Sequence, residues 1–180
     1  MSLEVSALRA VAHPVRLQIL SLLTGAELSA AEVARELGIT QANASYHLRV
    51  LKSAGHLVVA SEEKIRGGIA KRYRHPWKQG AGEHQGSAGL TDSRLVTEAV
   101  ARELVRRAGA RASTGKGLTV DAEVWVPPEV WQQALDLVRQ ASTLVHENAQ
   151  PPRSEGTQHV TMTSVLFEMS GPGDDEDASS

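Results

Sequence analysis

Residues 32–55 read EVARELGITQANASYHLRVLKSAG and contain two short helical patterns separated by a glycine. Ser29 and the glutamate three residues later form a capping box, which predicts a helix over 30–37 that Gly38 ends in a left-handed conformation. The threonine before residue 41 is a good N-cap for a second helix over 41–54. Two short helices joined by a glycine-containing turn are typical of a helix-turn-helix.

The segments on both sides of this helix pair predict a winged domain. His13-Pro14 separates a short apolar stripe around Leu8 from a second helical pattern, which we expect to run from Pro14 to about Leu23. Downstream lies a β-hairpin pattern, with a strand at 57–60, a tip at 65–68 and a returning strand at 70–75. The sequence therefore predicts a winged helix-turn-helix over 1–78.

The helix expected over 41–54 has one apolar and one polar side. At about 100° per residue, Ala44, Leu48 and Leu51 cluster on the apolar side. The opposite side is small and polar, which suits insertion into the major groove of DNA, where Arg pairs with guanine and Gln or Asn with adenine. His47 falls on the flank of the apolar side, and we interpret it as a packed core residue.

Basic charge is concentrated in the N-terminal half. Residues 1–79 hold 11 Lys and Arg against 6 Asp and Glu, whereas residues 80–180 hold 8 against 15. The run 64–78 contains no acidic residue and suits a polyanion, although a charge run taken alone is commonly a solvated face. Ser29 and Thr40, beside the helix N-termini, are candidates for phosphate contacts. Lys52 is a further candidate for a contact with the DNA backbone. The basic candidates in the hairpin are Lys64, Arg66, Lys71 and Arg72.

The rest of the chain predicts a second, smaller domain. Residues 79–90 are rich in glycine and lack periodicity, which indicates a linker. The pattern then predicts, in order, a helix from near Asp92, a strand over 118–126, a helix from Pro127-Pro128 and a strand over 159–169. We therefore expect an α+β protein with a winged helix-turn-helix at 1–78, a helix-strand-helix-strand domain at 91–170 and a disordered acidic tail at 171–180.

Several classes of chemistry are absent from the sequence. The 180 residues include no cysteine, which excludes disulfides, thiolate metal sites and cysteine nucleophiles. Neither HExxH nor GxSxG occurs, and Gly115-Lys116 departs from the phosphate-loop pattern. We therefore predict neither an enzyme nor a cofactor. Because no apolar run is long enough for a signal peptide or a membrane span, we expect a cytoplasmic protein without a membrane partner.

Three segments together resemble the ArsR-type winged-helix transcription regulators, namely HPVRLQIL at 13–20, EVARELGITQ at 32–41 and SYHLRVLKSAG at 45–55. The resemblance covers about residues 5–76, while the C-terminal half is more weakly similar to uncharacterised actinobacterial regulators of this type. It implies a homodimeric repressor, with base contacts from Gln41, Ala42, Asn43, Ser45, Tyr46 and Arg49. Metal-sensing members carry paired cysteines where this chain has Ser29-Ala30-Ala31, so that metal site is absent.

The expected partners are double-stranded DNA with an inverted repeat and a second copy of the chain, since useful specificity normally needs two recognition helices. The C-terminal half is expected to dimerise, to bind a small-molecule effector, or to do both. Trp125 and Trp131 are either core residues or the lining of an apolar pocket.

Two alternative functions stay open at the level of the sequence. One is an RNA-binding or protein-interaction module, although aromatic residues, on which single-stranded bases stack, make up only 3% of the chain. The other is a metal-responsive repressor that uses histidine and carboxylate ligands. Its candidate ligands are His84, His146, Glu147 and His159.

Overall fold

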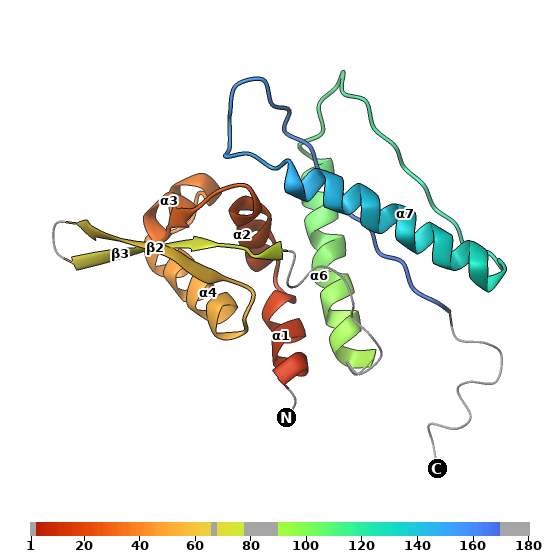
Figure 1. The fold of residues 1–180 in the computed structure, drawn as a ribbon, viewed down its shortest axis with the longest axis horizontal. Coiled ribbons are helices and arrows are strands. Elements are labelled where there is room, and N and C mark those ends of the chain that lie inside the picture. The colour runs from red at the N-terminus through yellow and green to blue at the C-terminus, as the bar shows by residue number, and fades with distance from the viewer. Residues whose placement is uncertain (1–2, 66–67, 78–89, 170–180) are drawn as a thin grey trace, which may run out of the picture.

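The computed structural model describes residues 3–65, 68–77 and 90–169. Within them it shows the expected α+β fold, in which a winged helix-turn-helix is followed by two longer helices (Figure 1). Most of the predicted linker, the predicted acidic tail, and the candidate site residues Arg66 and His84 lie outside the described residues.

Four helices build the N-terminal domain: α1 (Leu3–Val11), α2 (Pro14–Thr24), α3 (Ala30–Leu37) and α4 (Gln41–Ser53). Their ends follow the capping residues of the sequence. The Ser29 hydroxyl accepts a hydrogen bond from the Glu32 amide, the Glu32 carboxylate accepts one from the Ser29 amide, and Gly38 ends α3 at a φ of 65°. The Thr40 hydroxyl accepts from the Asn43 amide at 3.2 Å and starts α4. Both predicted helices of the helix-turn-helix are confirmed.

A three-stranded antiparallel sheet forms the wing. Its strands are β1 (Leu28–Ser29), β2 (Val58–Ile65) and β3 (Gly68–Arg74), in the order β1-β3-β2. The hairpin of β2 and β3 was predicted, and its register shifts between Val59 and Ser61, where one residue is left out of the ladder. The sequence did not predict β1, because a two-residue strand has no periodicity.

The core of this domain lies where α2, α3 and α4 meet the base of the wing. Its fully buried side chains include Ile19 and Leu23 of α2, Val33 of α3 and Leu48 of α4. His47 is also buried, as expected from its place beside the apolar side of α4. Burial of one side of α4 leaves its other side free to face a partner.

Helix α6 (Leu90–Ala108) packs against α1 and α2. Arg9 of α1 donates to the buried carboxylate of Asp92 at 2.9 Å, and Gln18 of α2 donates to the buried carboxylate of Glu103, also at 2.9 Å. Val96 rests against the core of the winged domain. Helix α6 therefore packs as part of the N-terminal domain, whereas the sequence predicts it in the C-terminal domain.

The prediction of two strands in the C-terminal half is wrong for a single copy of the chain. Helix α7 (Pro128–Glu147) begins at the predicted prolines, but 118–126 before it and 159–169 after it are neither strand nor helix (Figure 1). A strand exists only where its backbone N–H and C=O groups pair with a neighbour, and no described segment pairs with either. The alternating pattern of 118–126 is present in the sequence, but neither segment has a hydrogen-bonding partner among the described residues.

Candidate nucleic-acid interface

Helix α4 presents its polar side to the exterior. Ala44, Leu48 and Leu51 are completely buried, whereas Tyr46 is 54% exposed. The outward side chains are those of Gln41, Ala42, Asn43, Tyr46, Arg49 and Lys52, with Ser45 partly exposed beside them. The orientation expected from the helical period is thus confirmed, and the donors and acceptors suited to base edges lie together on one face.

A cleft of about 640 Å³ separates this helix from the wing. Gln41 and Ser45 line it from α4, Ser29 from the start of α3, and Lys71 and Arg72 from β3. The fold thus brings residues from three regions of the sequence to one concave surface. The N-terminus of α3 and the basic residues of β3 line this cleft together with the carboxylates of Glu32 and Glu63.

Arg72 contributes positive charge to this cleft and also holds two of its walls together. Its guanidinium lies 3.0 Å from a carboxylate oxygen of Glu32 and donates to the carbonyl of Glu27 at 2.8 Å. Burial raises the pKa of Glu32, but hydrogen bonds from Ser29 and the neighbouring Arg72 outweigh it and leave that pKa lowered. Glu32 is therefore ionised at neutral pH and holds both Ser29 and Arg72 in place.

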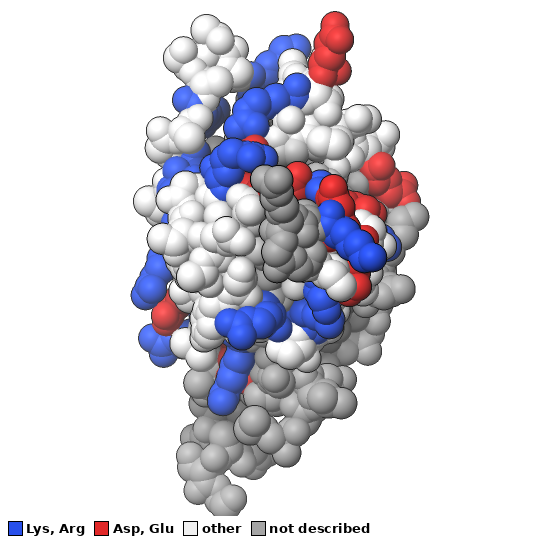
Figure 2. Space-filling view, turned by 90° about the vertical axis from the view of Figure 1, so that its left-hand side faces the viewer, with Lys and Arg blue, Asp and Glu red and all other residues white. Residues whose placement is uncertain are grey.

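Acidic residues from outside the run 64–78 neutralise part of its charge. Glu62 lies 3.4 Å from the ammonium of Lys71, and Glu27 lies 3.6 Å from the guanidinium of Arg74. Figure 2 shows this face, over which basic side chains are scattered with acidic side chains among them. Among the described residues, Lys52 and Lys64 have no acidic partner and keep their full charge.

The sequence reasoning missed a second polar cluster, on the side of α4 next to the start of α2. The ring centroids of His13 and His47 are 4.8 Å apart, and those of Tyr46 and His47 are 5.2 Å apart. Nε of Arg16 and Nδ1 of His47 are buried without a hydrogen-bond partner. Burial, and then the charges of His13 and Arg16, lower the pKa of His47. The helical period of the sequence does not distinguish Arg16 from a solvated arginine. Only the folded structure shows that Arg16 is partly buried beside this cluster.

The same region carries the similarity to known proteins. A family model described as a helix-turn-helix domain matches residues 11–58, which span α2 to the start of β2. The search of curated proteins found no match. Residues 11–58 therefore form a helix-turn-helix domain, the domain of DNA-binding regulators. Over the described ranges, no helix is both long and apolar enough to cross a membrane.

The candidate metal ligands that the structure describes, His146, Glu147 and His159, are not gathered into a metal site. In the described part of the chain, no group of three or more His, Cys, Asp or Glu side chains lies close enough to hold a metal ion. His146 instead donates from Nδ1 to the carbonyl oxygen of Ser142 in its own helix at 2.7 Å, and its ring centroid lies 5.1 Å from that of Trp77. His159 is exposed.

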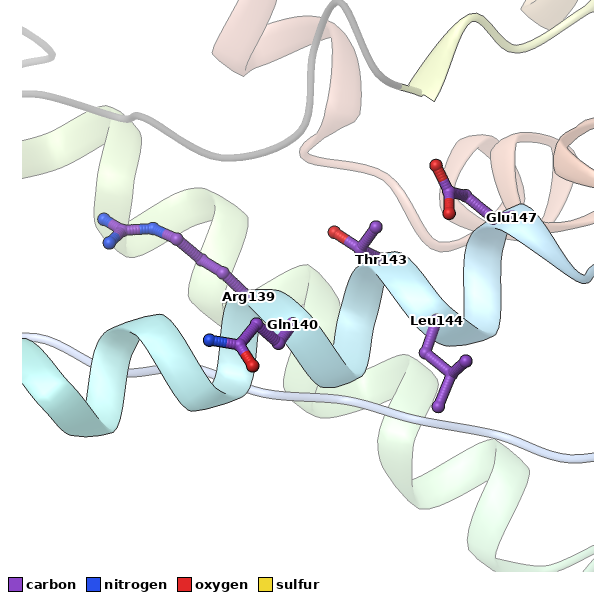
Figure 3. Close-up of a pocket in the computed structure, with 5 residues that line it drawn as sticks. All are labelled: Arg139, Gln140, Thr143, Leu144 and Glu147. Atoms are coloured by element: carbon purple, nitrogen blue, oxygen red, sulfur yellow. The ribbon is translucent and has the colours of Figure 1, made fainter.

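A shallow hollow lies on the surface of the C-terminal half. This hollow, of about 360 Å³, is lined by Arg139, Gln140, Thr143, Leu144 and Glu147, all from α7 (Figure 3). Trp125 is 92% exposed and Trp131 is partly buried, and neither lines this hollow or the cleft beside the wing. The expectation that Trp125 is a core residue is wrong, because its side chain is almost fully exposed in one copy of the chain.

Proposed function

We propose that this protein is a sequence-specific regulator of transcription that binds double-stranded DNA as a homodimeric repressor of the ArsR type. The observation that carries the proposal is the polar face of α4, held outward by a fully buried opposite side and flanked by a basic wing. Its natural complement is the major groove, which admits one α-helix.

The proposed base contacts come from the first three turns of α4. Arg49 pairs with guanine, Gln41 and Asn43 with adenine, and Ser45 with either base of a pair. Ala42 provides an apolar contact for a thymine methyl group, and Tyr46 lies at the edge of the same face. All six side chains are exposed or partly exposed in the structure.

The proposed phosphate contacts surround that face. Thr40 and Ser29 mark the N-termini of α4 and α3, where free amides attract an anion, and Lys52 and Lys64 bring unpaired charge. We add Arg16, whose buried Nε has no protein acceptor. Of the hairpin residues, Lys71 contacts the backbone directly, whereas Arg72 chiefly positions the wing through Glu32. Arg66 completes the basic tip.

A homodimer follows from the small footprint of one recognition helix. Two copies related by a two-fold axis place two α4 helices in major grooves about one turn apart, which requires an inverted-repeat operator. The bound dimer then represses by covering the operator. We propose no catalytic residue, no cofactor and no thiolate metal site, and a small-molecule effector would act on the C-terminal half.

Selection of bound duplexes from a random pool tests this proposal. The expected product is an inverted repeat whose half-sites lie about 10 base pairs apart, bound by the full chain but not by the Q41A/R49A double variant. Arg139→Ala, an exposed arginine of α7, is the matched control and should select the same sequence. Enrichment of no sequence, or preferential binding of single-stranded RNA, would reject sequence-specific duplex binding.

A further inference from the structure

The C-terminal half of a single chain has no core of its own. No described residue between 108 and 169 is buried, and fourteen large apolar side chains from Leu118 to Met169 are exposed by more than a third. Leu118 is 87% exposed and Phe167 is 63% exposed. Monomeric proteins rarely leave an apolar surface of this extent uncovered, so it marks an interaction site.

The two extended segments that flank α7 also lack a backbone partner. Residues 118–126 alternate apolar and polar side chains, and residues 159–169 have Val160 and Met162 on one side and Val165 and Phe167 on the other. No backbone hydrogen bond joins either segment to another described residue. Unpaired N–H and C=O groups along an extended chain are a template for another strand.

We propose that a second copy of this chain completes the C-terminal half, with residues 159–169 of the two copies paired as antiparallel strands across the two-fold axis. The inference rests on the proposed homodimer and assigns the element that forms it. A two-fold axis brings identical segments together in antiparallel orientation, so one extended segment that pairs with its own copy satisfies both chains at once.

Charge decides which of the two segments lies at the axis. Pairing of 118–126 with its own copy would place Asp121 opposite Glu123 and gather four carboxylates on one face, which is unfavourable between directly opposed residues. The stretch from 159 to 167 contains no acidic residue, and its side chains are apolar or hydroxylated apart from His159. Residues 159–169 therefore suit the central position, and 118–126, with a charged outer side, suits an outer strand.

The area available agrees with a stable dimer. Burying a large apolar side chain removes roughly 60–120 Å² from water, so the fourteen exposed ones together match the ~800 Å² per partner of a standard interface. Four segments from two chains also exceed the three strands that an independent sheet needs. Exposed apolar residues of α7, such as Leu137 and Leu144, would cover one face of that sheet.

Single cysteines test the register, because the natural chain has none to interfere. Ser164 is the midpoint of 159–169, so Ser164→Cys places two thiols directly opposite, with Cα atoms about 4.5–5.5 Å apart, within the range of a disulfide. Val160→Cys is the matched control, because antiparallel pairing about residue 164 separates the two copies of position 160 by about 27 Å. Without DNA, mild oxidation should convert most of the S164C protein, and little of the V160C protein, to a covalent dimer.

A second pair of variants separates the interface from folding. Phe167→Asp should weaken dimerisation at least tenfold in sedimentation, with unchanged circular dichroism, because this side chain is 63% exposed within one copy. Val105 of α6 is about as exposed as Phe167, and Val105→Asp should leave the dimer intact. Equal cross-linking of S164C and V160C, or an undiminished F167D dimer, would overturn the assignment. Both measurements omit DNA, so their failure leaves duplex binding standing, whereas a cross-linked dimer that selects no duplex would reject the proposed function.

Discussion

The guanidinium of Arg72 lies 3.0 Å from the carboxylate of Glu32, although the two residues are 40 positions apart in the sequence. This contact joins the wing to α3, the first helix of the helix-turn-helix. Glu32 also caps α3 through Ser29, with 2.8 Å between its carboxylate and the Ser29 amide. One acidic residue therefore sets both the start of α3 and the position of β3. Both Glu32 and Arg72 line the cleft beside α4.

Arg72 and Lys71 should respond differently to removal of their charge. Arg72→Ala breaks a partly buried, hydrogen-bonded ion pair and should lower the free energy of unfolding by about 1–3 kcal/mol. Lys71→Ala breaks an exposed pair and should change stability by less than about 1 kcal/mol, but should reduce the slope of log K against log[salt] by about 0.9. Urea denaturation and salt titration check the two effects. Equal stability losses would contradict the positioning role of Arg72.

Substitutions on the outward face of α4 should affect specificity more than overall affinity. Arg49→Ala and Gln41→Ala should each weaken the selected duplex by about 1–3 kcal/mol, because each removes a contact to a base edge. Nonspecific duplex binding should fall much less. Competition titrations with both kinds of duplex measure the difference, with R139A as the unaffected control. A uniform loss on every sequence would assign these residues to the backbone instead.

Arg16 should behave as a phosphate ligand. Arg16→Ala removes a guanidinium beside His13 and His47 whose Nε has no hydrogen-bond partner and whose terminal nitrogen donates to the Arg9 carbonyl at 3.3 Å. It should weaken all duplexes alike, with a salt slope smaller by about 0.9. Arg94→Ala provides the control, since Arg94 is an exposed arginine on α6, remote from α4. Unchanged affinity in R16A together with an unchanged salt slope would show that the cluster only packs the two helices.

The junction between the wing and α2 should loosen in mild acid. His75 donates its backbone amide to Leu23, its ring lies 3.3 Å from the Thr24 hydroxyl, and burial, with lesser effects of His56 and His146, lowers its pKa to about 4. The unfolded chain, with the ordinary value of 6.5, therefore binds the proton more readily than the folded chain. Stability should be complete above pH 6.5 and decline as the pH falls toward about 4.

Denaturation at a series of pH values checks this expectation. The His75→Gln variant, which keeps a polar side chain without the titration, should show a smaller decline between pH 6.5 and 4. An identical decline in both proteins would attribute the acid sensitivity to other groups.

Glu103 should stabilise the packing of α6 down to a much lower pH. Burial raises its pKa, but hydrogen bonds from Arg106, Gln18 and Arg107 outweigh burial and bring the value to about 2. Because the folded-state pKa lies below the ordinary 4.5, this stabilisation is present above pH 4.5 and is lost as the pH falls toward 2. Glu103→Ala should cost about 1–3 kcal/mol at pH 7, since it leaves the Gln18 amide and the partly buried Arg107 guanidinium without this acceptor. Thermal unfolding of both proteins measures the loss.

Much of the N-terminal domain could be predicted because its determinants are local. The capping box at Ser29, the left-handed Gly38 and the threonine cap at position 40 each act within four residues, so they mark the helix ends in the sequence itself. The helical period likewise orients α4, whose buried and outward sides agree with the structure. For the same reason, the polar face of α4 was recognisable as the candidate interface.

Tertiary structure decided what depends on residues far apart in the chain. The pairing of β1 with β3, the neutralisation of Arg72 by Glu32, the docking of α6 through Glu103 and the polar cluster at Arg16 all join segments brought together only by folding. The prediction of two C-terminal strands was wrong for the same reason. The apolar pattern of each segment is local, but a strand also needs a hydrogen-bonding partner along its edge. The described part of one chain does not supply that partner. Local interactions are encoded by neighbouring residues, whereas pairing depends on which surfaces the complete fold leaves open.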